Sequence, residues 1–404
     1  MNDTVYWIWL SEALGPGEKT LELVSFYNWN AEEIYKASVR DIFALGIYTL
    51  QRVKKFKAYP LENAIKSYND AVSTGIKIIT PQSEYFPEQL KRIDNAPLVL
   101  YVRGDETVLK NELSVSVVGA REASDYGCAV AKALSSALAG KGFTIISGGA
   151  RGIDSEAHFG ALEEGGKTVC VMGCGLNVNY LAEMNPMREK IAKSGAVISE
   201  YPPKAPASRT TFPVRNRIIS ALSLGTIVVE AGERSGSLIT ARLALEQGKD
   251  VFAVPGDLVH SSFLGTNKLI RDGAIAVFSP NDILEEYYSE YYDKIVDKTR
   301  FPDDEIIRRA QKYLSEPKQE TDKKISANVN EKKEKSQKVK RDAPDYLTEE
   351  AKKIYSVLSE EPTHVDLLSE QSGLTVAQTL SALTELEVYA LATALSGRRY
   401  TIKD

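Results

Sequence analysis

Glycine- and arginine-rich segments in the middle of the chain carry the residue types that bind phosphate groups. One run is GAREASDYG (119–127) and another is SGGARGID (147–154). Glycine lets a backbone approach an anion closely, and exposed amides and the forked arginine guanidinium donate hydrogen bonds to its oxygens. In these two loops we predict phosphate contacts from Gly119, Arg121, Ser147, Gly148, Gly149 and Arg151.

Three later segments add to this set. In RTTFPVRNRIIS (209–220) we expect a helix to begin just after Phe212 and Pro213, with cations in its first turn that oppose the helix dipole and call for an anion. A salt bridge from these arginines to Glu200 or Glu230 is the alternative. The candidate contacts here are Phe212, Arg215, Asn216 and Arg217, with Ser235, Gly236 and Ser237 at the start of the next helix and Lys268 further on.

Other residues around these loops have two interpretations. Tyr180 and Tyr201 either stack on bases or pack in the core. The cations at or beside the loops outnumber the nearby acids, so a chain with a formal net charge of −5 can still carry a local basic channel. These cations are Arg121, Arg151, Lys204, Arg209, Arg215, Arg217, Arg234, Lys268 and Arg271.

Catalytic and cofactor chemistry finds little support in the residue types. The three histidines, His158, His260 and His364, are scattered without a nucleophile and carboxylate around them, so we expect a binding protein and no enzyme. The first loop lacks the full G-x-G-x-x-G spacing of dinucleotide sites, and we expect no bound cofactor. The three cysteines have no zinc-ligand spacing, and we expect no metal.

The elements that must position these loops form an α/β pattern. Short β-branched runs alternate with longer helical segments, which is typical of βαβ units in a parallel sheet. Ligands bind such sheets outside the carboxyl ends of the strands, and the candidate loops follow the strands. We expect strands at 98–102, 114–118, 143–147, 167–172, 196–199, 226–230, 250–254 and 274–278.

The 404 residues divide into four parts. We expect a small helical domain over 1–80, with a helix-like stretch at 31–57, and a Rossmann-like domain over 83–290. The turns at LGPG (14–17) and LG (45–46) either resemble those of SAM or helix-hairpin-helix modules or simply join packed helices. A polar, charged stretch at 315–345 is expected to be a flexible linker. Three helices and a short hairpin over 346–404 predict a winged helix, with Thr375 capping its third helix.

No apolar run is long enough to span a membrane, so we expect a cytoplasmic protein.

The row of loops resembles the DNA-processing protein A (DprA, Smf) family. The resemblance rests on VVGAR (117–121), SGGARGID, SEYPP (199–203), FPVRNRII (212–219), SGSLITA (235–241) and VPG (254–256). Two departures stand out: Ala120 replaces the usual Ser or Thr, and Leu181 stands where Pro is common. The resemblance implies a homodimer joined through its Rossmann domains that binds single-stranded DNA and loads RecA recombinase during natural transformation (competence).

Two other functions compete with this one. A nucleotide phosphoribohydrolase resembling the LOG enzymes would use Glu230 beside the glycine-rich turn, although the chain lacks their PGGxGT run. A winged-helix regulator of transcription would read a specific duplex. The expected third helix of the winged helix (375–387) contains neither Lys nor Arg, which favours a protein-contact role for this domain over duplex binding.

Overall fold

The computed structural model describes residues 3–315, 344, 346–359, 363–389, 391–395 and 398–402. Residues 3–315 belong to one compact unit, and the described residues from 344 onward belong to a second. The expected linker at 315–345 lies almost wholly outside the described residues.

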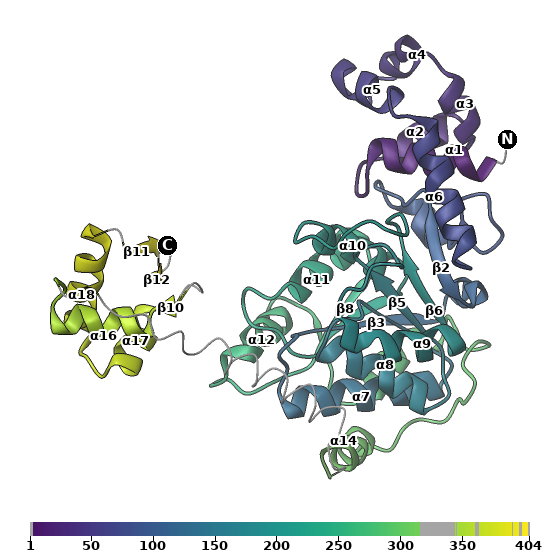
Figure 1. Cartoon of the computed structure of the whole chain (residues 1–404). Helices are drawn as coiled ribbons and strands as arrows, with labels where there is room; N and C mark the ends of the chain where they lie inside the picture. Colours follow the sequence, from purple (N-terminus) through teal and green to yellow (C-terminus); the bar gives the residue numbers. More distant parts are fainter. Residues whose placement is uncertain are drawn as a thin grey trace. The chain divides into compact units, whose positions relative to one another are not determined.

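The first unit begins with six short helices wrapped around an apolar centre (Figure 1). Trp7 and Trp9 on the first helix are completely buried there, together with Phe56. The stretch at 31–57 is broken into three helices, because Ser38 and Thr49 each start a new one by capping it. The helices are α1 (Asp3–Leu14), α2 (Leu21–Phe26), α3 (Ala31–Lys36), α4 (Val39–Ala44), α5 (Leu50–Lys57) and α6 (Leu61–Ser73).

A mixed sheet forms the core of the first unit, with strand order β1-β2-β6-β5-β4-β3-β7-β8-β9. The strands from β6 to β9 in this order are parallel. At the other end of the sheet, β2 pairs with β6 and β1 pairs with β2, both in antiparallel fashion. All eight expected strands are confirmed; the edge strand β1 was missed. The strands are β1 (Lys77–Ile79), β2 (Leu100–Gly104), β3 (Ser114–Val118), β4 (Thr144–Ser147), β5 (Thr168–Met172), β6 (Ala196–Ser199), β7 (Gly225–Val228), β8 (Asp250–Ala253) and β9 (Ile275–Ala276).

Helices cover both faces of this sheet (Figure 1). From β3 the chain proceeds outward through β4, β5 and β6, and then returns to the other side of β3 through β7, β8 and β9. Because crossovers are right-handed, the helices after β3, β4 and β5 cover one face of the sheet and those after β6, β7 and β8 cover the other. The reversal creates a switch point between β3 and β7. One face carries α7 (Asp125–Gly140), α8 (Ile153–Glu163) and α9 (Asn185–Ser194); the other carries α10 (Thr211–Ala221), α11 (Ser237–Glu246) and α12 (Leu264–Arg271).

The chain continues beyond the expected end of the Rossmann-like domain. After α13 (Pro280–Tyr288), α14 (Glu305–Ser315) packs on α7. The buried Lys141 at the end of α7 holds the intervening segment: its Nζ donates to Asp297 Oδ2 and to the Thr299 carbonyl oxygen, each at 2.6 Å.

The second unit has the expected order of a winged helix. It contains α16 (Glu349–Val357), β10 (Thr363–His364), α17 (Val365–Ser372), α18 (Val376–Val388), β11 (Ala392–Leu395) and β12 (Arg399–Ile402). Thr375 caps α18 as predicted, in a reciprocal capping box with Gln378. The core of this unit includes Ile354, Leu368 and Leu383.

Candidate functional site

A pocket of about 890 Å³ opens at the switch point of the sheet. Its walls come from the loops after β3 and β7, from the loop that leads into α10, and from the first turns of α10 and α11. Of the residues predicted as phosphate contacts, the pocket is lined by Gly119, Arg121, Phe212, Arg215, Asn216, Ser235, Gly236 and Ser237.

A buried carboxylate fixes the loop that follows β3. Glu230, only 1% exposed, accepts hydrogen bonds from the Ser124 amide (3.0 Å) and hydroxyl (2.7 Å). Ser124 in turn caps α7 by accepting from the Gly127 amide. At Gly119 a side chain would meet Ile153 at 2.5 Å, so the turn requires glycine. This scaffold leaves Arg121 exposed at the rim of the pocket.

The glycine cluster of the second loop shapes the floor of the site. Ser147 is fully buried and donates its hydroxyl to the Val117 carbonyl oxygen at 2.7 Å. A Cβ on Gly148 would lie 2.7 Å from the Arg215 guanidinium, and Gly149 has a φ of +66° and faces Cys170. Ser147, Gly148 and Gly149 therefore do not line the pocket and serve the packing beneath it.

Two aromatic rings and two guanidinium groups meet beside the pocket. Phe212 lies 5.1 Å from Tyr180, centroid to centroid, and the guanidinium carbons of Arg121 and Arg215 lie 5.5 and 5.9 Å from the Phe212 ring centroid. These distances are within cation–π range. The rings and the exposed Arg121 together present a surface for a flat, negatively charged partner.

Helix α10 begins at Thr211, one turn earlier than we expected. Phe212 and Pro213 are thus inside its first turn, where proline is tolerated because its missing N–H has no helical partner. Arg215 and Arg217 lie in the second turn.

Arg215 and Arg217 point in different directions from this helix. Arg215 is 5% exposed, lines the pocket, and donates to the Gly148 carbonyl oxygen at 2.9 Å. Burial lowers the pKa of its guanidinium and raises the pKa of the Asp154 carboxyl, and attraction between the two charges opposes both shifts. Arg217 lies outside the pocket lining in a buried ion pair with Glu200, at 2.6 Å. The alternative of a salt bridge to Glu200 therefore describes Arg217.

The loop after β5 carries Tyr180 and Leu181, the second departure from the family's pattern. Leu181 adopts a left-handed φ of +48°, which a proline at this position could not reach. The buried Arg188 supports the loop by donating to the Tyr180 carbonyl oxygen at 2.6 Å. Tyr180 lines the pocket, whereas Tyr201 is 7% exposed and donates its hydroxyl to the Thr211 carbonyl oxygen at 3.1 Å.

The start of α11 offers polar groups to the pocket. The hydroxyls of Ser235 and Ser237 lie 2.8 Å apart, and a side chain on Gly236 would meet no atom within 4 Å. The turn is therefore open to a ligand, and the helix amides behind it favour anions.

The predicted edge cations differ in their availability. Arg209 and Arg234, which the sequence placed beside the loops without assigning them a contact, line the pocket; within the described residues they form no ion pair. Arg151 pairs with Glu183, with Nε to Oε1 at 2.7 Å, and is not in the pocket lining. Lys268 is exposed on α12, also outside the lining.

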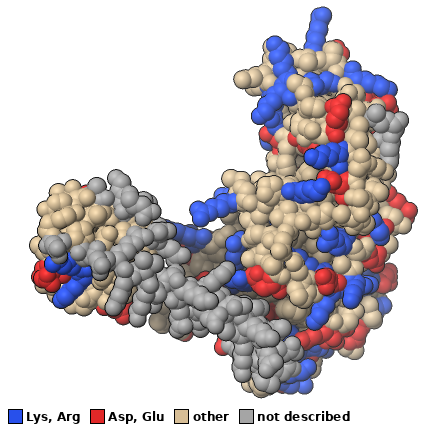
Figure 2. Space-filling view, viewed as in Figure 1, with Lys and Arg blue, Asp and Glu red and all other residues tan. Residues whose placement is uncertain are grey.

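The charge around the pocket is mixed. The exposed cations Arg121, Arg209 and Arg234 share the rim with Glu122 and Glu233. Figure 2 likewise shows both signs of charge interspersed around the sheet, while Lys and Arg gather at the α4–α5 end of the N-terminal helices. The pocket is thus suited to holding successive phosphates by individual contacts. It is less suited to attracting an anion through a broad positive surface.

Other kinds of site receive no structural support in the described part of the chain. No group of three or more His, Cys, Asp or Glu side chains is arranged to hold a metal ion there. Cys128, Cys170 and Cys174, all within the described residues, form no disulfide. Among the described helices, none has the length and apolar character to cross a membrane.

Comparison with known proteins identifies relatives of both units. The family described as DNA recombination-mediator protein A matches residues 77–288, and the DprA winged helix domain matches residues 338–398. Protein Smf of Synechocystis is 31% identical, with 99% of this chain and 98% of that protein aligned. DNA processing protein DprA of Bacillus subtilis is 40% identical over 57% of this chain and 81% of its own length. The X-ray structure of DprA from Streptococcus pneumoniae has a TM-score of 0.61 at 33% identity, covering 71% of this chain and 99% of that one.

Proposed function

This chain belongs to the DNA processing protein A (DprA, Smf) family, and from that premise we propose that its switch-point pocket binds single-stranded DNA without catalysing a reaction on it. The observation that carries the proposal is the juxtaposition of Phe212 and Tyr180 with the exposed Arg121. Unpaired bases can stack on the rings, while the guanidinium and the amides at the start of α11 hold phosphates. Contacts to phosphates and to the faces of bases carry no direct sequence information, so we expect little sequence preference.

The phosphoribohydrolase alternative needs Glu230 to reach a substrate. Glu230 is 1% exposed and holds Ser124 through its Oε2 atom, which supports a structural role for this carboxylate. A release assay for free base on a panel of nucleoside monophosphates tests this directly, and any turnover would contradict the non-catalytic proposal.

Gel-shift titration of an oligo-dT strand tests the binding proposal, with an equal length of duplex as competitor. We expect the strand to be retarded at low salt and the duplex to compete poorly. Failure to shift the strand, or equal competition by the duplex, would reject the proposal.

We further propose that the protein acts in the cytoplasm as a homodimer that loads RecA onto incoming DNA during natural transformation. Large apolar side chains at the β8–β9 end of the sheet support an interface there: Leu258, Val259 and Phe278 are 81, 89 and 69% exposed. The mass in solution by light scattering tests the dimer, with Val259→Asp as the disrupting variant and Val296→Asp, 78% exposed on another segment, as control.

Strand exchange by RecA on strands covered by single-strand binding protein tests the proposed loading of RecA; no stimulation would refute it.

For the winged helix we propose a protein-contact role. Helix α18 contains no Lys or Arg, and Val376 near its start and Leu367 on α17 are 43 and 46% exposed. Deleting residues 346–404 should leave the affinity for oligo-dT unchanged within about twofold. A marked loss of duplex binding on deletion would instead assign the domain to DNA.

A further inference from the structure

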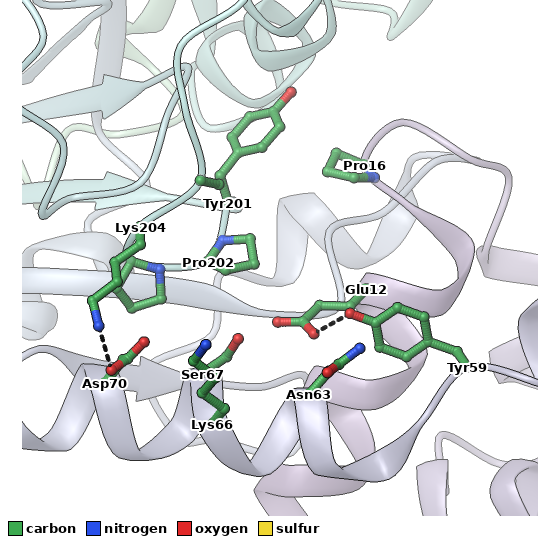
Figure 3. A pocket seen from close by; sticks show the side chains of 12 residues that line it. Glu12, Pro16, Tyr59, Asn63, Lys66, Ser67, Asp70, Tyr201, Pro202 and Lys204 are labelled. Carbon is green, nitrogen blue, oxygen red and sulfur yellow. Dashed lines mark hydrogen bonds and ion pairs between the residues drawn. The ribbon is translucent and has the colours of Figure 1, made fainter.

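A second pocket, of about 410 Å³, lies between the helical domain and the sheet, away from the switch point (Figure 3). Helices α1 and α6 and the connection before α6 form one side, and the loop after β6 (residues 201–205) forms the other. Both sides belong to the same compact unit. The DNA proposal makes no use of this pocket.

Glu12 places a carboxylate in this pocket with half of its hydrogen-bonding capacity unused. Its Oε2 accepts from the Tyr59 hydroxyl at 2.8 Å, and burial raises the pKa of that hydroxyl to about 12, so Tyr59 stays a donor at neutral pH. Oε1 is buried and has no hydrogen-bond partner within the described chain. In Figure 3 this second oxygen points away from Tyr59, into the space beneath Pro202. A buried carboxylate oxygen without a donor is costly, and a cation with N–H groups would satisfy it.

The walls around Glu12 suit a flat cation on an apolar stem. The Tyr59 ring and the rings of Pro16 and Pro202 line the pocket (Figure 3). The backbone of Tyr59 is fixed, because its carbonyl oxygen accepts from Trp9 Nε1 at 2.9 Å. A guanidinium stacks on aromatic faces and pairs with carboxylates through a planar fork, which a compact ammonium cannot do.

The remaining charges leave Glu12 as the receptor for that cation. Lys204 and Asp70 neutralise each other across the mouth of the pocket, with Nζ to Oδ1 at 2.7 Å. Lys66 also lines the pocket and is exposed, and it forms no ion pair within the described residues. A bound cation would have to displace Lys66 from the neighbourhood of Glu12 or share the space with it.

We propose that this pocket binds an arginine side chain of a partner protein, with Glu12 as the anionic receptor and Tyr59 as the stacking surface. The chemistry is that of a guanidinium on an alkyl stem. The loop 201–205 is followed after one residue by Ala207, Ser208 and Arg209, which line the switch-point pocket, so the two pockets draw on one connection of the chain.

The test is a titration of the full chain with N-acetyl-arginine-amide, with N-acetyl-citrulline-amide as its neutral, nearly isosteric control. The chain has three tryptophans, so the indole N–H resonances in a nitrogen-15 spectrum are few, and that of Trp9 reports on Tyr59. We expect the Trp9 signal to shift saturably with the arginine compound and at least about tenfold more weakly with citrulline, since one charged hydrogen bond is lost.

Variants separate the carboxylate from the shape of the pocket. Glu12→Gln should weaken arginine binding at least about tenfold, whereas Glu62→Gln, an exposed carboxylate of α6 outside the pocket, should leave it unchanged. Lys66→Ala should bind at least as tightly as the parent, because a competing cation is removed.

Three results would overturn the proposal. Equal binding of the arginine and citrulline compounds to the parent chain would show that the pocket does not recognise the positive charge. This comparison needs no variant, so it holds even if Glu12→Gln fails to fold. Unchanged affinity in a folded Glu12→Gln protein removes Glu12. Binding of spermidine as tight as that of the arginine compound assigns the pocket to a soluble polyamine in place of a partner's side chain.

Discussion

Replacing Arg121 by alanine should weaken single-strand binding about 10- to 30-fold. Arg121 is exposed at the pocket rim and forms no ion pair within the described residues, so the contact that its removal breaks there is the cation–π contact with Phe212. A charged hydrogen bond to phosphate contributes about 1.5 to 2 kcal/mol at such an exposed position. At about 1.4 kcal/mol per decade this corresponds to the stated loss of affinity.

The salt dependence separates a phosphate contact from a change in shape. Losing one phosphate contact on a single strand lowers the slope of log K against log salt by about 0.7 in magnitude. Fluorescence anisotropy of labelled oligo-dT between low and moderate salt measures both quantities. Arg300→Ala, which removes an exposed arginine paired with Glu285, is the matched control and should change neither. An unchanged affinity for Arg121→Ala, or a weaker affinity with the parent slope, would refute the reasoning.

Three further variants change a ring of the pocket, the buried Arg217–Glu200 pair and the Lys141–Asp297 pair at the end of α7. Phe212→Ala should cost about 1 to 3 kcal/mol of strand affinity while keeping the parent salt slope, because stacking is lost and no charge is removed; a reduced slope would contradict this. Arg217→Ala should lower the free energy of unfolding by about 3 to 5 kcal/mol, since it leaves Glu200 buried and unpaired; denaturant titration measures it, and a stable variant that loses only DNA binding would contradict it. Hydrogen bonds from Lys141, and then from the Thr299 amide and hydroxyl, lower the pKa of Asp297 from 3.8 to about 2, so these contacts stabilise the fold above about pH 4 and lose their effect as the pH falls toward 2; Asp297→Asn should be less stable than the parent at pH 6, with the difference vanishing near pH 2, and a constant difference would argue against these contacts.

The sheet was predictable because its strands are buried on both faces and form continuous apolar runs. Runs such as the one with Val115 and Val117 or the one with Ile145 and Ile146 indicate buried strands of a parallel sheet. The strand β1 was missed because it has only three residues and lies at the edge of the sheet, where Lys77 is exposed.

The candidate site was predictable as a set of loops, but the role of each side chain was not. Arg215 and Arg217 carry equal charge, yet residues two apart on a helix point to different sides, so only one can face a given pocket. The partner of Arg151 is Glu183, 32 residues away in sequence, and no local pattern reveals such a pair. Ser147 is of a residue type that can bind phosphate. It is the last residue of β4, however, and its hydroxyl donates to the neighbouring strand β3.

The most direct test of the central claim is the affinity of the protein for oligo-dT and for duplex of equal length, measured across one salt series. We expect tighter binding of the single strand at every salt concentration, with an affinity that falls as salt rises because phosphates are neutralised. We also expect similar affinities for strands of different sequence. Tighter binding of the duplex, or strand binding that is insensitive to salt, would contradict a pocket that stacks bases on Phe212 and holds phosphates with Arg121.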